Sequence, residues 1–205
     1  MKKNLFAVVL LLILAFGAAA QNDDHEYAPL TEKEIAYQDW TYKNVKTNQE
    51  VNLREFTKNK ELVMVFYFAP WCHSSNYQAP VTQKLYEKYK DKGFAVIGVS
   101  LYGSIARVED TMEKRGVGFP VVSESESLKE RKETLHYKYR NITGDYRKWG
   151  TPWNIFLVPG KLEKEGDVLT NKTTVVNGEI REKEAEAFIR EKLGLPAKEA
   201  KAKIE

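Results

Sequence analysis

The sequence predicts an α/β domain with a largely parallel central β-sheet. Two runs of strand length, Leu62–Phe68 and Phe94–Val99, are apolar along nearly their whole length, which is typical of strands buried on both faces. A segment with helical spacing of apolar residues follows each run, at Ser74–Lys90 and at Ile105–Arg115. Strands and helices that alternate in this way favour a sheet flanked by helices.

A hairpin is expected before the first buried strand. Trp40–Tyr42 and Val51–Leu53 look like short strands on either side of the polar turn Lys46–Glu50. Leu53–Phe56 is then expected to begin one helical turn. In the long helix that follows, Pro80 interrupts the pattern and should kink the axis. The predicted apolar stripe of that helix consists of Tyr77, Val81, Leu85 and Tyr89.

In the second half of the chain the spacing of apolar residues is less regular. The segment His136–Gly150 is aromatic, basic and aperiodic, which indicates a loop, and Asn177-Gly178 predicts a strong turn. The other expected elements are a strand at Phe119–Val122, a charged helix at Ser123–Leu135, strands at Ile155–Val158 and Thr173–Val176, and a closing helix at Glu179–Leu195.

The composition excludes several classes of protein. The 205 residues are 42% apolar and 30% charged, an ordinary globular balance that argues against a wholly disordered chain. The formal net charge of +3 argues against a broad basic face for nucleic acid. One cysteine excludes a disulfide within the chain, and three histidines leave little room for a metal centre. We expect neither a metal nor another cofactor.

The first twenty residues have the layout of a secretory signal peptide. Two lysines precede an apolar run from Asn4 to Phe16, and small residues lead to Ala20, after which cleavage is expected. A retained membrane anchor is the alternative, but the run of about 12–15 apolar residues is shorter than the roughly 20 that span a bilayer. We therefore expect a periplasmic or secreted protein without stable membrane insertion. Its parts would be a flexible segment at residues 21–36, one domain at 37–195 and a charged tail at 196–205.

Cys72 is the residue best placed for chemistry. It follows the first buried strand and begins the next helix, where free backbone N–H groups and the helix dipole favour a thiolate. A cysteine in such a place can ionise well below the roughly 8.5 of a free thiol. Ser75 could donate a hydrogen bond to the sulfur, His73 is cationic when protonated, and Trp71 can shield one side. The alternative is a buried, inert cysteine, which the polar residues after Cys72 argue against.

The segment Phe68–Ser75 (FAPWCHSS) resembles the active-site segment of the thioredoxin superfamily, in which a strand ends in W-C-x-x-C and a helix follows. Pro80 matches the proline that kinks the family's active-site helix. Gly150–Pro152 resembles the family's cis-proline loop, which faces the cysteine. Trp40–Phe56 resembles the N-terminal hairpin of the exported TlpA/ResA-like branch. The resemblance implies a thioredoxin-like fold with a central mixed β-sheet, flanking helices and an N-terminal β-hairpin extension, over residues 37–195.

The resemblance also implies a surface that binds a partner. Thr151 and Pro152 would lie opposite the cysteine, and because a proline lacks an N–H group, the Thr151 backbone could offer its pairing groups to an extended partner segment. Trp149 and Trp153 flank this dipeptide. They are either core residues or, together with Trp71, walls of the partner groove.

The chain departs from the pattern of the family at three positions. Ser75 replaces the second cysteine, so the chain lacks the two thiols that a dithiol reductase or oxidase cycle needs. Phe66 stands where thioredoxins carry a buried aspartate. Ala69 does not match the threonine of the peroxiredoxin T-x-x-C pattern, which argues against peroxidase chemistry by that route.

Two functions of different classes are compatible with these residues. In the first, an exported monothiol protein carries out thiol–disulfide exchange through Cys72, of the isomerase or mixed-disulfide reductase type, on a protein or small-molecule thiol or disulfide client. In the second, the same groove binds a peptide or a subunit without catalysis. A homodimer bridged through Cys72 is a third hypothesis. Whether the chain is an enzyme therefore stays open at this point.

Overall fold

The computed structural model describes residues 25–197, which contain a mixed β-sheet of eight strands in the order β1-β8-β7-β4-β5-β6-β2-β3. The strands are β1 (Thr31–Gln38), β2 (Thr41–Asn44), β3 (Glu50–Asn52), β4 (Leu62–Phe68), β5 (Phe94–Ser100), β6 (Val121–Ser123), β7 (Trp153–Leu157) and β8 (Val168–Val176). The α-helices are α2 (Leu53–Thr57), α3 (His73–Tyr89), α4 (Ile105–Lys114), α5 (Leu135–Ile142) and α6 (Glu182–Lys192). Short 3₁₀ turns are η2 (Lys90–Lys92), η3 (Leu128–Glu130) and η4 (Pro159–Lys161).

β4 is buried on both of its faces, as its continuous apolar sequence predicts. It pairs in parallel with β5 and antiparallel with β7. Because alternate side chains of a strand point to opposite faces, Val63, Val65 and Tyr67 enter one core, and the side chains between them enter the other. No residue of β4 is more than 1% exposed, so both faces are covered along its whole length.

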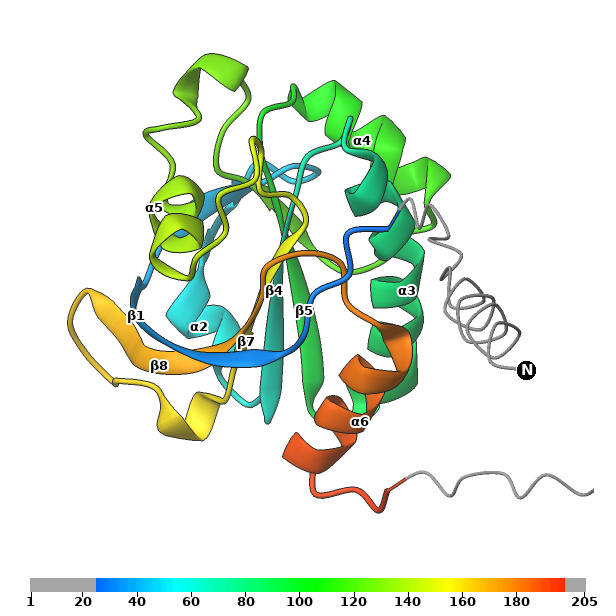
Figure 1. Cartoon of the computed structure of the whole chain (residues 1–205), viewed down its shortest axis with the longest axis vertical. Helices are drawn as coiled ribbons and strands as arrows, with labels where there is room; N and C mark the ends of the chain where they lie inside the picture. The colour runs from blue at the N-terminus through cyan, green and yellow to red at the C-terminus, as the bar shows by residue number, and fades with distance from the viewer. Residues whose placement is uncertain (1–24, 198–205) are drawn as a thin grey trace, which may run out of the picture.

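Helices cover the two faces of the sheet unequally (Figure 1). α3, α4 and α6 pack on the face that receives Phe66, and their inward residues belong to the same core as that side chain. α2 and α5 pack on the face that receives Tyr67. The architecture is therefore a thioredoxin-like three-layer arrangement, and the predicted fold class is confirmed.

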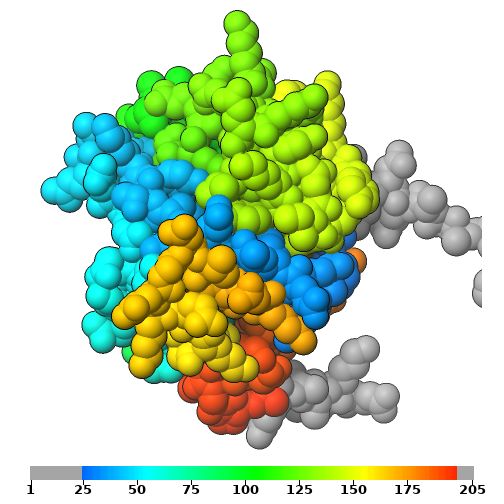
Figure 2. All heavy atoms as spheres, turned by 90° about the vertical axis from the view of Figure 1, so that its left-hand side faces the viewer, coloured from blue at the N-terminus to red at the C-terminus, as the bar shows by residue number. Residues whose placement is uncertain are grey.

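The two edges of the sheet are both formed by the N-terminal part of the chain. The predicted hairpin is present as β2 and β3, and β2 joins the main sheet through β6. At the other edge β1 pairs with β8, and the two strands lie side by side on the surface shown in Figure 2. The expectation of a flexible segment up to residue 36 is therefore wrong for Thr31 onward. The charged residues of this segment do not indicate a strand, yet it forms β1, in which only Ile35 and Tyr37 are buried.

The region between β6 and β7 also differs from the prediction. The predicted helix at Ser123–Leu135 consists of turns around η3, and the predicted loop at His136–Gly150 contains α5. The start of α5 explains this shift, because the Thr134 hydroxyl accepts a hydrogen bond from the backbone N–H of Tyr137 at 3.1 Å. The Glu124 carboxylate accepts another from the N–H of Leu135 at 2.5 Å. Two side chains thus cap a helix that its own periodicity does not reveal.

The buried face of α3 is more polar than the predicted stripe. Leu85 and Tyr89 are buried as expected, but Tyr77 is 47% exposed. Gln78 is buried instead, and its side-chain oxygen accepts hydrogen bonds from the Ile180 N–H at 3.1 Å and from the Asn154 amide at 3.3 Å. This amide therefore joins α3 to β7 and to the segment before α6.

The predicted signal peptide lies outside the described residues, as does the C-terminal tail beyond residue 197. Across residues 25–197, none of the helices combines the length and the apolar character that crossing a bilayer requires.

Gln78→Ala should lower the free energy of unfolding by about 2 kcal/mol, because it leaves a buried amide and a buried backbone N–H without their acceptor. Denaturant unfolding of the two proteins measures the difference. Lys84→Ala, an exposed change on the same helix, should cost less than about 1 kcal/mol. Equal losses in the two variants would contradict the role given to Gln78.

Candidate active site

The pairing of β7 with β4 brings the two predicted site segments together. Tyr67 of β4 lies opposite Trp153 of β7 in antiparallel register. The chain leaves β4 toward Cys72 at the same end of the sheet where it enters β7 from Thr151. Residues that are 79 positions apart in the sequence therefore meet at this end of the sheet.

Cys72 is the N-cap residue of α3 and is half-buried. Its thiol lies 3.3 Å from the carbonyl oxygen of Thr151 and donates to it. The Cys72 N–H donates to the Ala69 carbonyl at 3.0 Å, which holds the turn between β4 and α3. Cys72 makes no capping hydrogen bond through its own side chain, so the sulfur does not satisfy the free N–H groups of the first turn.

A groove of about 260 Å³ opens beside the sulfur. Trp71 and Trp149 form its aromatic wall and pack edge to face with ring centres 5.1 Å apart. The Trp71 indole N–H donates to the Tyr102 carbonyl at 3.0 Å, which fixes the ring. The groove is lined by Glu26, Trp71, Cys72, His73, Ser74, Arg147, Lys148, Trp149, Gly150 and Thr151.

Two hydroxyl groups in the region of the cysteine are buried and have no hydrogen-bond partner among the described residues. They belong to Ser75 and Thr151, each 2% exposed. Both hydroxyls have a proton to donate and a free choice of rotamer. A thiol becomes a strong hydrogen-bond acceptor only when it ionises. Hydroxyl groups that have a proton to donate and no other partner can then donate to the thiolate.

The other predicted site residues differ in their burial and in their position relative to the groove. His73 is exposed, and its ring packs edge-on against Tyr77 with centres 4.5 Å apart. The Thr151–Pro152 peptide bond is cis, and Pro152 is buried behind the groove rather than lining it. Trp153 is fully buried and its indole N–H donates to Asn177 at 2.8 Å. Of the two alternatives for Trp153, the structure shows the core position, because this first residue of β7 belongs to the buried core.

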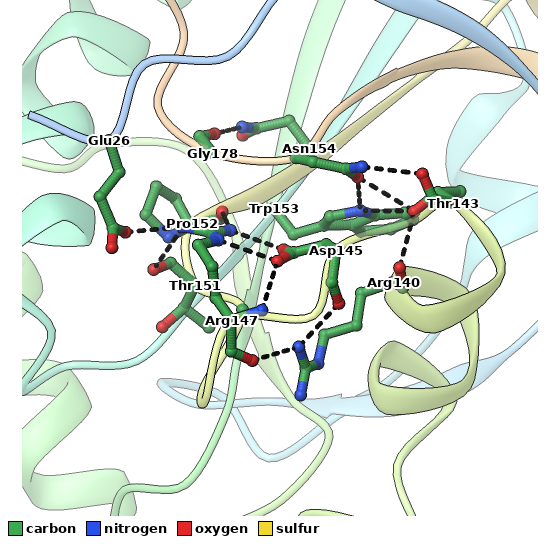
Figure 3. Close-up of polar contacts among 12 residues, drawn as sticks. Glu26, Arg140, Thr143, Asp145, Arg147, Thr151, Pro152, Trp153, Asn154 and Gly178 are labelled. Carbon is green, nitrogen blue, oxygen red and sulfur yellow. Dashed lines mark hydrogen bonds and ion pairs between the residues drawn. The ribbon is translucent and has the colours of Figure 1, made fainter.

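Arg147 holds the Thr151–Pro152 end of the loop, as Figure 3 shows, and no motif in the sequence pointed to this arginine. Its guanidinium donates to both carboxylate oxygens of Asp145, at 2.9 and 2.7 Å. It also donates to the carbonyls of Thr151 at 3.4 Å and Pro152 at 2.8 Å, and to the Glu26 carboxylate at 2.6 Å. Burial alone lowers the pKa of Arg147, but the hydrogen bonds and charges of Asp145 and Glu26 outweigh it, so the pKa is raised.

His136 supports the same loop from the side of the core. Its Nε2 lies 3.0 Å from the Gly150 carbonyl, which can only accept, so Nε2 carries the proton. Nδ1 then accepts from the Tyr102 hydroxyl at 3.2 Å. Burial lowers the pKa of His136 to about 3, which keeps the ring neutral. The loop predicted for His136–Gly150 does not include His136, which lies on α5 and is fully buried.

Gly150 fits this loop because of its backbone and its neighbour. Its φ is +63°, a conformation that favours glycine, and a Cβ at this position would collide with the side chain of Arg140. Arg140 in turn donates to the carbonyl oxygens of Asp145 at 2.9 Å and Arg147 at 2.6 Å. The loop is thus held by two arginines and a neutral histidine.

The departures from the thioredoxin pattern are visible in the structure. Phe66 is fully buried and stacks on Phe68, so an apolar ring occupies the position of the family's buried aspartate. Ala69 is buried and contributes a methyl group where a peroxiredoxin has a hydroxyl. Within residues 25–197, no group of three or more potential metal-ligating His, Cys, Asp or Glu side chains is present.

Together the fold and the site define a thioredoxin-like domain with one thiol at the end of its central strand. The profile of the AhpC/TSA family matches residues 35–146, and the chain belongs to this family.

Two sequence relatives and one solved structure show where the similarity lies. The chain is 32% identical over 127 residues to the thiol-disulfide oxidoreductase ResA of Bacillus cereus, covering 59% of this chain and 70% of that protein. It is 36% identical over 59 residues to ResA of Oceanobacillus iheyensis, covering 29% of this chain and 31% of that protein. The thioredoxin domain of a thiol-disulfide oxidoreductase from Bacteroides vulgatus superposes with a TM-score of 0.54 at 20% identity, over 78% of this chain and 96% of that domain. The chain is thus homologous to thiol-disulfide oxidoreductases.

Replacing His136 with Gln should flatten the pH dependence of stability between about pH 6 and pH 4. The unfolded chain binds a proton at His136 near 6.5, whereas the folded chain does not until about 3, so acid favours unfolding. Wild-type stability should therefore fall by up to about 1.4 kcal/mol per pH unit from this group as the pH drops through that window.

Denaturant unfolding at pH 4, 5, 6 and 7 tests this prediction. The pKa of Glu124 is raised to about 7 by burial and has the opposite effect on stability, but Glu124 is present in both proteins and cancels in the comparison. Parallel stability curves for the two proteins would contradict a buried neutral His136.

Proposed function

We propose that this chain is an exported, monothiol thiol–disulfide exchange protein that works through Cys72. The observation that carries the proposal is the position of the sulfur, which lies at the uncapped start of α3, beside a groove and 3.3 Å from the Thr151 carbonyl. Homology to thiol-disulfide oxidoreductases supports the class of reaction. The signal-peptide layout of residues 1–20 supports export to the periplasm or the exterior.

The reaction needs two exchange steps because the chain has one thiol. The Cys72 thiolate attacks one sulfur of a client disulfide, forming a mixed disulfide and releasing the other client sulfur as a thiolate. A second thiolate, from the client or from a small molecule, then attacks the client sulfur of the mixed disulfide and releases Cys72. Each step exchanges one S–S bond for another, so the cycle isomerises a client or reduces a mixed disulfide.

Each candidate residue has a distinct part in this proposal. The N–H groups at the start of α3 and the Ser75 hydroxyl stabilise the thiolate, and His73 contributes charge only when protonated. Thr151 lines the groove and presents its backbone to an extended client, while Pro152 shapes the loop from behind. Trp71 and Trp149 form the apolar wall against which a client packs.

A non-catalytic binding role is the second candidate, and Phe66 favours it. In that role the groove binds a peptide or subunit, and Cys72 is incidental. The buried ring of Phe66 removes the proton acceptor that thioredoxins place there, and Ser75 removes the second thiol. The two candidates differ in one measurable quantity, the reactivity of the Cys72 sulfur as a function of pH.

The alkylation rate of Cys72 in the folded chain should show a pH midpoint well below the roughly 8.5 of a free thiol. Ser75→Ala should raise that midpoint, because it removes a donor to the thiolate. Cys72→Ala should abolish labelling and serves as the control. A midpoint near that of a free thiol, or no labelling until the chain unfolds, would reject exchange chemistry and leave the binding role.

Ser75→Cys should create an intramolecular disulfide with Cys72 and confer net reduction of client disulfides. Residues three apart on a helix have Cβ atoms roughly 5–6 Å apart, close enough to be bridged by a small adjustment. Quantification of free thiols after mild oxidation, with and without prior reduction, detects the bond. Two free thiols that persist after oxidation would show that Ser75 does not face the sulfur.

A further inference from the structure

Arg147 stands at the meeting point of three segments that surround the sulfur. We call Arg147, Asp145 and Glu26 the arginine clamp. Asp145 is buried, with a side chain 1% exposed, and binds the guanidinium through both oxygens. Glu26 comes from the N-terminal segment and is 48% exposed. Figure 3 shows these contacts converging on the Thr151–Pro152 dipeptide.

The N-terminal segment is tied to the domain independently of Arg147. The Glu26 N–H donates to the Glu179 carboxylate at 2.8 Å, and the Glu179 N–H donates to the Glu26 carbonyl at 2.8 Å. Glu179 is itself buried. The backbone of Glu26 is therefore fixed at the rim of the groove even if its side chain is changed.

The thiol and the guanidinium share one acceptor. Cys72 Sγ lies 3.3 Å from the Thr151 carbonyl oxygen, and Arg147 Nη1 lies 3.4 Å from it. The sulfur and the guanidinium are thus at most about 7 Å apart, inside the screening length of roughly 8 Å at physiological salt. A charge on the sulfur therefore interacts electrostatically with the charge of the guanidinium.

Ionisation of the thiol changes which groups donate hydrogen bonds to the Thr151 carbonyl oxygen. The thiolate has no proton to donate, so the Thr151 carbonyl keeps only Arg147 as its donor among these two groups. The positive guanidinium then lies between the carbonyl and the buried Asp145, whose oxygens are both occupied. The other charged or titratable groups that line the groove are His73, Lys148 and Glu26.

We propose that Arg147 is a positioning residue for Cys72: it holds the Thr151 carbonyl, whose hydrogen bond favours the thiol, and its positive charge stabilises the thiolate. Glu26 restrains this effect by pairing with Arg147. The proposal rests on the proposed exchange function and adds two residues to its site. It predicts that the two charges of the Arg147–Glu26 pair act on the sulfur in opposite directions.

The test is the alkylation rate of Cys72 by iodoacetamide against pH in the mature chain. Arg147→Gln leaves Glu26 and Asp145 unopposed, so the midpoint should rise and the rate at pH 6 should fall about threefold or more. Glu26→Gln frees the guanidinium, so the midpoint should fall and the rate at pH 6 should rise about twofold. Arg147→Lys keeps the charge and should recover part of the lost rate.

The controls separate this proposal from a loss of structure. Lys84→Gln removes one positive charge three turns along α3 and should leave the midpoint unchanged. Thermal unfolding monitors the fold of every variant, and Glu26→Gln alters an exposed side chain, which keeps the test decisive if Arg147→Gln is unstable. Midpoints that shift in the same direction, or that do not shift, overturn the proposal. A wild-type sulfur that does not react in the folded chain overturns the exchange function itself.

Discussion

The antiparallel pairing of β7 with β4 is the constraint on which the site depends. Tyr67 opposite Trp153 sets the register that brings Thr151 to the sulfur of Cys72. A slip of one residue would turn every side chain of β7 to the opposite face, and the two cores on either side of the sheet exclude that. Core packing therefore places the start of β7, and with it the end of the loop that faces the thiol.

Three groups hold that loop, and Arg140, which binds the carbonyls of Asp145 and Arg147, is one of them. On the core side, the neutral ring of His136 joins the Gly150 carbonyl to the Tyr102 hydroxyl, and the Tyr102 carbonyl holds the indole of Trp71. On the solvent side, the charged Arg147 holds the next two carbonyls. The neutral ring of His136 brings no ion into the core, whereas the charge of Arg147 lies where carboxylates and solvent meet it.

The sequence predicted those elements that depend on residues close to one another in the chain. The apolar run of β4 and the N-cap position of Cys72 follow from neighbours in the chain, whereas the place of Thr151 opposite the cysteine was implied only by the resemblance to the thioredoxin superfamily. The prediction missed β1 because an edge strand needs few apolar residues. It missed α5 because the start of this helix depends on Glu124, eleven positions before Leu135. Arg147 and Glu26 could not be paired from the sequence, since they are 121 positions apart and neither belongs to a motif.

The attachment of Glu26 beside Glu179 has a consequence for the order of assembly. These residues are 153 positions apart, so the contact closes one of the longest loops in the chain. During synthesis Glu26 precedes its partner, which appears only with the segment between β8 and α6. The contact of Glu26 with Glu179 can therefore form only after nearly the whole domain has been synthesised, whereas β4, Cys72, α3 and β5 are complete much earlier in the chain.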